Sequence, residues 1–344
     1  MNEMSPSVPT KTARTRADWP RPWLVADIGG TNARFGWLEG GAARVKHVQT
    51  LPTAAYAGPA AAARVYLDRL SALLGSAYQA PRAGAFAVAT AVGGDRVSFT
   101  NSGWSFSRRD TGAELALDEL LLLNDFEALA LSLPHLGSDQ VRPIGAAAGP
   151  AVSGALAVIG PGTGLGVAGI LPTAQGWVAV AGEGGHASLS AADDFESAVL
   201  AAVRRDHAHV SAERLLSGIG LPVLHKAVAA VLGHGGGALT AEEIVARGLA
   251  RSDPACDRTV DAFCALLGSF AGNVALVFGA RGGVYIGGGI VPRLGERFFA
   301  SDFRQRFEAK GRFNDYLRAI PTALITDTLA ALTGAVVALD RHGA

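Results

Sequence analysis

The stretch "WLVADIGGTNARFGWL", Trp23 to Leu38, decides the expected fold. Two apolar runs, residues 23–28 and 33–38, flank a turn that contains two glycines, a threonine and an asparagine, which is the pattern of a β-hairpin. A third candidate strand follows at residues 43–49, and a helical pattern follows near residues 54–75. We then expect a strand at residues 84–90, a helix around residues 111–119, a strand at residues 120–123 and a helix from Phe126. The order predicted from this half of the chain is βββαβαβα.

A similar order of signals begins again at Ala155. Three strand-like runs, residues 155–160, 166–171 and 177–182, are separated by glycine-rich turns, and a helical stretch follows from Asp193. In both copies a Gly/Thr turn lies between the first two strands. The repetition predicts two related α/β lobes.

The end of the chain is expected to return to the first lobe. Residues 323–326 have the pattern of a strand, and a helical pattern begins at Thr328. We therefore expect a small lobe made of residues 23–134 and 327–344, and a large lobe made of residues 135–326. Residues 1–22 are rich in Pro, Thr and Ala, and we expect them to be disordered.

Composition limits the classes of partner. The 344 residues are 49% hydrophobic, and 30 basic residues balance 30 acidic ones, so no net field favours nucleic acid or an anionic membrane. No apolar run reaches the roughly 20 residues of a membrane span, and Met1 to Arg21 lacks the apolar centre of a signal peptide. These features predict a soluble, cytoplasmic protein that binds small molecules.

The cysteines carry no evident chemistry. Cys256 and Cys264 lie eight residues apart in a helical pattern, about 12 Å along the axis, which is too far for a disulfide. No Cys/His cluster in the sequence has the spacing of zinc ligands. Both cysteines are expected to be small core residues.

The first glycine turn has the parts of a phosphate-binding hairpin. Gly29 and Gly30 let backbone N–H groups approach a phosphate, Thr31 and Asn32 can donate further hydrogen bonds, and Asp27 can hold a Mg²⁺-bound water. An ordinary type I′ turn with a capping aspartate is the alternative.

Two further glycine turns can bind a nucleotide. Gly162 and Thr163 form a second turn like the first, and Gly288 follows a strand where a base or ribose can lie against the backbone. Residues 164–169 formally match a dinucleotide fingerprint, but this match is rejected because the segment is predicted to be a strand rather than the start of a helix. A plain hairpin and a tight strand-to-helix turn remain the alternatives.

Polar residues interrupt apolar or glycine-rich segments elsewhere. Asn124 and Asp125 follow four leucines, so they either cap the next helix or do chemistry at the end of a sheet strand. The start of a helix favours an ionised Asp125. A ligand that is rich in hydroxyl groups needs several hydrogen-bond acceptors that converge on it. Each of the candidate residues also has an ordinary structural explanation. The candidates are Asn101, Asn124, Glu183, His186 and Glu213.

Several motifs occur together and in one order: "ADIGGTNARF", "LNDFEALA", "GPGTGLG", "GEGGH", "SAERLLSG" and "GGVYIGGGIVPR". From Trp23 onward the chain resembles the bacterial glucokinase family, in the hexokinase and actin-like ATPase superfamily. The resemblance implies an α/β fold of two RNase H-like lobes with an interlobe cleft, a homodimer, and glucose and MgATP as substrates.

The resemblance also implies roles for single residues. Asp125 matches the base that faces the 6-hydroxyl of the sugar, and Asn101, Asn124, Glu183, His186 and Glu213 match positions around the sugar. The ATP-binding turns correspond to Asp27, Gly29, Gly30, Thr31, Asn32, Gly162, Thr163 and Gly288. Asp27 would contact Mg²⁺ through water. The zinc-binding cysteine cluster of the repressor and open-reading-frame kinase (ROK) family is missing from the sequence.

Two other functions stay open at this point. One is a related sugar kinase that uses another hexose or another phosphoryl donor, such as ADP or polyphosphate, because every such donor needs anion-binding turns. The other is a non-catalytic sugar sensor. No helix-turn-helix extension or basic segment in the sequence favours the sensor.

Overall fold

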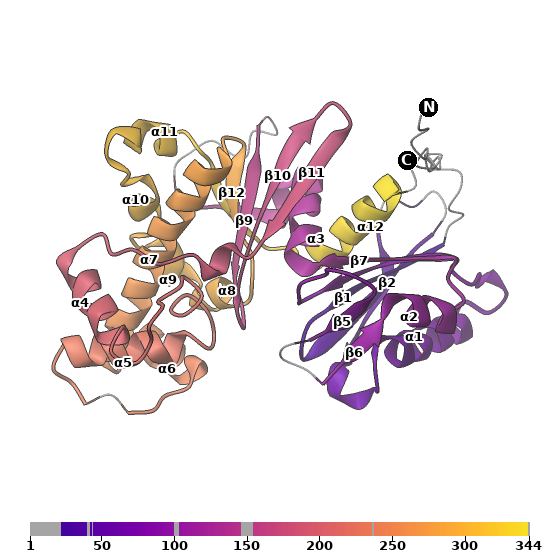
Figure 1. Cartoon of the computed structure of the whole chain (residues 1–344), viewed down its shortest axis with the longest axis horizontal. Helices are drawn as coiled ribbons and strands as arrows, with labels where there is room; N and C mark the ends of the chain where they lie inside the picture. The colour runs from indigo at the N-terminus through magenta and orange to yellow at the C-terminus, as the bar shows by residue number, and fades with distance from the viewer. Residues whose placement is uncertain are drawn as a thin grey trace, which may run out of the picture. The chain divides into compact units, whose positions relative to one another are not determined.

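The computed structural model describes residues 22–39, 42, 44–99, 103–145, 154–235 and 237–342. These residues divide between two compact units, one formed by residues 1–128 with 332–344 and the other by residues 129–331. The expectation of disorder for residues 1–22 lies outside the described residues except for Pro22, and Asn101 lies outside them as well. Figure 1 shows the helices and strands of each unit.

The first unit contains a five-stranded mixed sheet in the order β3-β2-β1-β4-β7. β1 pairs antiparallel with β2 and parallel with β4, and β4 pairs parallel with β7. The strands are β1 (Trp23–Ile28), β2 (Asn32–Leu38), β3 (Lys46–Pro52), β4 (Ala83–Val88) and β7 (Glu119–Asn124). The predicted order of three consecutive strands followed by alternating helices and strands is confirmed.

Helices and a small hairpin complete the first unit. The helical segments are α1 (Pro59–Leu74), α2 (Arg108–Glu114), the start of α3 (Asp125–Ser132) and most of α12 (Ala330–His342). The predicted start of a helix at Ala54 is wrong, because Pro59 begins α1 after the extended Gly58. The predicted helix over residues 111–119 is also wrong, since α2 ends at Glu114 and Glu119 already belongs to β7. The hairpin of β5 (Arg96–Ser98) and β6 (Ser105–Ser107) was not predicted.

The second unit repeats the arrangement of the first sheet. Its strand order is β11-β10-β9-β12-β13-β8, in which the first five strands have the same directions as their counterparts and β8 adds an antiparallel edge. The strands are β8 (Val141–Pro143), β9 (Leu156–Pro161), β10 (Leu165–Thr173), β11 (Gly176–Gly182), β12 (Gly283–Ile286) and β13 (Thr322–Ile325). The repeat seen in the sequence is therefore a repeat of topology.

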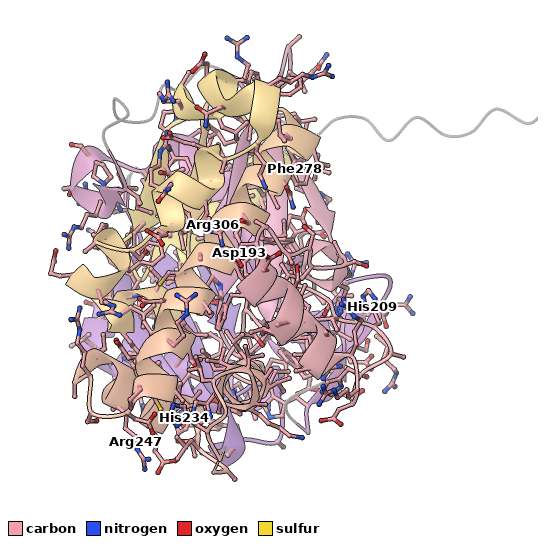
Figure 2. The ribbon with its side chains drawn as sticks, turned by 90° about the vertical axis from the view of Figure 1, so that its left-hand side faces the viewer. Asp193, His209, His234, Arg247, Phe278 and Arg306 are labelled. Carbon is pink, nitrogen blue, oxygen red and sulfur yellow. The ribbon has the colours of Figure 1, made fainter. Side chains whose placement is uncertain are left out.

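The second unit carries the additional helices. They are α4 (Asp194–Val203), α5 (Leu221–Val231), α6 (Ala241–Leu249), α7 (Pro254–Phe278), α8 (Ile290–Leu294), α9 (Glu296–Phe299), α10 (Phe303–Glu308) and α11 (Asn314–Arg318). The short helices between residues 290 and 318 were not predicted. Arg306 of α10 pairs with Asp193, which caps α4, and Figure 2 shows the two side chains near each other.

Helix α7 is long and apolar enough to cross a membrane, and it is the one helix of the described residues that meets this test. Its most apolar window is 78% buried inside the protein, as expected for a core helix. The Asp253 side chain accepts hydrogen bonds at its N-terminus, and Gly279 ends it in the left-handed conformation.

The boundary between the units falls inside two helices. Ala128 and Leu129 of α3 belong to different units, and so do Ala331 and Leu332 of α12. The sequence predicts that the chain passes from one lobe to the other after Pro134 and returns at Asp327. Compact units need not be the lobes that move relative to each other, so the predicted lobe boundaries stay a prediction.

Within the first unit, α12 lies very close to the start of α3. A Cβ atom at Gly334 would lie 1.7 Å from the Ala128 carbonyl oxygen, so no larger residue fits without movement of the backbone. This approach fixes the helix whose first residue is Asp125.

We expect Gly334→Ala to lower the free energy of unfolding by about 1–3 kcal/mol, because the new methyl group overpacks the contact between the helices. The measurement is urea unfolding followed by circular dichroism and tryptophan fluorescence. Gly58→Ala is the matched control, since nothing lies within 4 Å of a Cβ atom there. Equal stability of the two variants would contradict the close approach.

Candidate active site

The carboxyl ends of three parallel strands bring two aspartates to one edge of the first sheet. Ile28, Val88 and Asn124 are in register across β1, β4 and β7. Asp27 is the penultimate residue of β1, and Asp125 comes directly after β7. Two strand spacings separate these strands by about 10 Å, so side chains from both can approach each other above β4.

Asn124 caps helix α3. Its Oδ1 accepts hydrogen bonds from the backbone N–H groups of Phe126 at 2.9 Å and Glu127 at 3.4 Å, and its Nδ2 donates to the Thr90 carbonyl at 3.2 Å. The Asn124 side chain is thereby held between the start of α3 and the segment that follows β4. Of the two alternatives for the Asn-Asp pair, capping belongs to Asn124, which leaves Asp125 as the first residue of the helix.

The electrostatics of Asp125 differ from the sequence-based expectation. Burial and, to a smaller extent, the negative charge of Asp27 raise the pKa of Asp125 to about 7, although hydrogen bonds to its carboxylate lower it. The helix start alone favours an ionised carboxylate, and this expectation was wrong because desolvation outweighs the helix end. The pKa of Asp27 is also raised by burial, and the positive charge of Arg34 opposes that rise.

The first glycine turn is a three-residue connection from β1 to β2. The Gly29 N–H donates to the Asn32 carbonyl at 2.9 Å, and neither Gly29 nor Gly30 is among the described glycines with positive φ. This excludes the type I′ alternative, which requires positive φ at both central residues. Thr31 and Asn32 are exposed, as a ligand-binding turn requires.

Two residues that the sequence did not single out support this turn. Thr53 donates from Oγ1 to the Gly30 carbonyl at 2.7 Å and from its backbone N–H to the Thr31 carbonyl at 2.9 Å. Arg34 pairs with Asp27 at 3.4 Å. The hairpin register, which places Arg34 opposite Asp27, could have identified the second contact from the sequence.

The second glycine turn connects β9 to β10 in the other unit. The Gly162 carbonyl accepts from the Gly218 N–H at 2.7 Å, and the Thr163 carbonyl accepts from the Ile219 N–H at 3.4 Å. Segment 164–169 runs into strand β10, so the rejection of the dinucleotide fingerprint is confirmed. The Gly162 and Thr163 carbonyl groups therefore both point toward residues 218–219, and Thr163 is exposed.

Gly288 lies against the second turn. It adopts φ +77°, and a Cβ atom there would lie 2.4 Å from the Pro161 carbonyl oxygen. Because β9 and β12 are parallel neighbours, the glycines after β12 and the turn after β9 meet at one edge of the second sheet. Only glycine satisfies both the conformation and the space.

Glu213 connects the second turn with His186. Its Oε2 accepts a hydrogen bond from the Leu165 N–H at 2.9 Å, and its Oε1 lies 3.8 Å from His186 Nε2. Its backbone N–H donates to the Gly185 carbonyl at 2.8 Å. Glu183 begins the short turn that contains His186, and the Glu183 carbonyl accepts a hydrogen bond from the His186 N–H at 3.0 Å. The second unit therefore groups His186 and Glu213 beside the glycine turn, with the exposed Glu183 next to them.

The chain is similar to known proteins along nearly its whole length. The family model "Glucokinase" matches residues 24–342. The glucokinase of Aromatoleum aromaticum is 47% identical, and the alignment covers 93% of this chain and 95% of that protein.

Among solved structures, a glucokinase from an Antarctic psychrotroph is 38% identical with a TM-score of 0.83, over 92% of this chain and 98% of that one. A ROK-family glucokinase from Streptomyces griseus, solved with glucose and AMPPNP, shares the fold at 19% identity, with a TM-score of 0.57 over 92% of this chain and 98% of that one.

The fold is that of the actin-like ATPase class of sugar kinases, as the resemblance implied. The sequence match to the family model extends over nearly the whole described chain, so it identifies the protein family more specifically than the fold does. The chain belongs to the glucokinase family, and it is a kinase.

The raised pKa of Asp125 predicts a stability change with pH. An unfolded chain deprotonates Asp125 near its ordinary value of 3.8, whereas the folded protein holds the proton up to about pH 7. The folded protein therefore loses stability as pH rises through this window, on the order of 4 kcal/mol for this one group. Asp125→Asn should remove that part of the loss and be the more stable protein above pH 7.

The measurement is urea unfolding of both proteins at pH 5 and pH 8. Asp110→Asn is the control, since Asp110 also lies in the first turn of a helix but is exposed. If Asp125→Asn keeps the full pH dependence of the unchanged protein, the raised pKa is wrong.

Proposed function

We propose that this protein transfers the γ-phosphoryl group of ATP to the 6-hydroxyl of D-glucose, giving glucose 6-phosphate and ADP as the first step of glucose use in glycolysis. The observation that carries the proposal is the Asp125 carboxyl group, with a pKa of about 7, at the same sheet edge as Asp27 and the first glycine turn. Membership of the glucokinase family supports the choice of glucose and ATP.

Asp125 is the proposed general base. A base with a pKa near the working pH is deprotonated in about half of the molecules and is still basic enough to accept the hydroxyl proton. The 6-oxygen forms its bond to the γ-phosphorus while the bond from that phosphorus to the bridging oxygen of ADP breaks, and the proton passes to Asp125. The reaction asks the protein mainly for alignment and charge neutralisation.

The anion-binding groups are proposed to be the two glycine turns, where backbone N–H groups can approach phosphate oxygens. Gly288 packs against the backbone of the second turn, and the nucleotide is proposed to lie beside it. Asp27 fits Mg²⁺, since its carboxylate is a hard oxygen donor and its ion pair with Arg34 is long, at 3.4 Å. When bound, Mg²⁺ would neutralise phosphate charge.

The sugar-binding groups are proposed to be Glu183, His186 and Glu213, together with Asn124 and Asn101. The Asn124 amide carries two N–H bonds, one of which is donated to Thr90, so the other can serve a sugar hydroxyl. Because this residue also caps α3, its larger role is to hold Asp125 in place. The interlobe cleft implied by the resemblance stays a prediction.

A homodimer in the cytoplasm is part of the same proposal. The homodimer rests on the family resemblance, and light scattering of the purified protein checks it.

The deciding experiment is a matrix of phosphoryl donors and acceptors. The purified protein is incubated with glucose, fructose, mannose or N-acetylglucosamine against ATP, ADP or polyphosphate. We expect the highest kcat/KM with glucose and ATP. Preference for another hexose or donor would support a related sugar kinase instead, and sugar binding without turnover would support a sensor.

Asp125→Asn should lower kcat by on the order of 10² or more, because it keeps the shape and removes the base. Glucose binding, measured by calorimetry, should persist, and Asp110→Asn should behave like the unchanged protein. Near-normal turnover of Asp125→Asn would contradict the assignment of Asp125 as the general base.

Glu213→Gln should chiefly raise the KM for glucose, by about tenfold, because a charged acceptor for sugar hydroxyls is lost. The amide oxygen can still accept from the Leu165 N–H, so the second turn is expected to stay in place. Steady-state kinetics with each substrate varied in turn separate the two effects. A change confined to the KM for ATP would contradict the sugar role.

A further inference from the structure

Three potential metal ligands meet in the helical part of the second unit, in a cluster that the proposed kinase site does not use. They are His225 of α5, Asp253 and Cys256, and one donor atom from each lies within 4.8 Å of the others. Sequence spacing gave no sign of this cluster, because 28 residues separate the histidine from the aspartate. The packing of α5 against α7 brings them together.

The start of α7 fixes two of the three groups. Asp253 is the N-cap residue, and its Oδ1 accepts hydrogen bonds from the N–H groups of Ala255 at 2.8 Å and Cys256 at 3.1 Å. These bonds hold the carboxylate over the first turn, where the Cys256 side chain also lies. The second carboxylate oxygen is not used by the cap.

His225 supplies an independent indication of a ligand. The residue is only 3% exposed, and its Nε2 has no hydrogen-bond partner among the described residues. Buried polar atoms are nearly always paired, so an unpaired one needs an explanation. A neutral imidazole binds metal ions through the ring nitrogen that carries no hydrogen.

We propose that His225, Asp253 and Cys256 form a binding site for Zn²⁺. Imidazole nitrogen, thiolate sulfur and carboxylate oxygen are the donors that zinc takes in proteins. Donors of a tetrahedral zinc ion lie about 3.3–3.8 Å from each other, given bonds of 2.0–2.3 Å. The present separations of at most 4.8 Å require the side chains to draw together by about 1 Å or slightly more.

The charges around the cluster act in both directions. Arg247, which is labelled in Figure 2, opposes a cation, whereas Glu243 favours one and pairs with Arg247 at 3.8 Å. A metal ion that binds the Cys256 sulfur must displace the thiol proton, which passes to solvent.

Zinc bound in this position would connect α5 to the start of α7. Asp253 is partly exposed, so a water molecule can complete the coordination from that side. The ion would then stabilise the folded protein by mass action without taking part in the kinase reaction.

Cobalt titration of the purified full-length protein tests the site, since Co²⁺ replaces Zn²⁺ and shows a charge-transfer absorption band only when a thiolate is bound. We expect the band to reach its maximum at one equivalent, and Zn²⁺ to abolish it. Cys264→Ser is the matched control, because Cys264 is the other buried cysteine of α7 and lies outside the cluster. It should keep the band.

Cys256→Ser should lose the band, and His225→Gln should weaken Co²⁺ binding at least about tenfold. Circular dichroism shows whether each variant is folded, and His225→Gln decides the question if Cys256→Ser is not. The proposal is overturned if the unchanged protein gives no band, if Cys256→Ser keeps it, or if Cys264→Ser loses it.

Discussion

The parallel pairing of β1, β4 and β7 is the constraint on which the first unit depends. Backbone hydrogen bonds place the ends of these strands in register, so the position of Asp27 determines what Asp125 meets. Two carboxyl groups then lie in a desolvated environment at one edge, and the charge of Asp27 disfavours ionisation of Asp125. The arrangement costs stability above neutral pH and, in the function that we propose, provides a base.

The second unit uses the same topology for a different purpose. Its equivalent edge carries a glycine turn supported from behind by Gly218 and from the side by Gly288. Glu213 reaches this turn through Leu165 and approaches His186 with its other oxygen. The Glu213 carboxylate thus contacts both the proposed phosphate-binding turn and the proposed sugar-binding residue His186. A substitution on one side can therefore affect the other.

Duplication also explains where the two units differ. The five shared strands need the same alternation of apolar runs and turns, whereas the extra helices of the second unit cover additional apolar surface around α7. In that added region His225, Asp253 and Cys256 come together. A site there is free to affect stability without changing the sheet edge where chemistry is proposed.

The sequence by itself determined the repeated strand order, both glycine turns and the Asn-Asp pair after β7, because strand periodicity and turn residues are local properties. It missed β8 and the short helices of residues 290–318, whose few residues carry too weak a periodicity. Only the tertiary structure decided the protonation of Asp125, since desolvation depends on every neighbour. It also decided the partners Thr53 and Thr90 and the grouping around His225, because those contacts join segments whose separation no local pattern encodes.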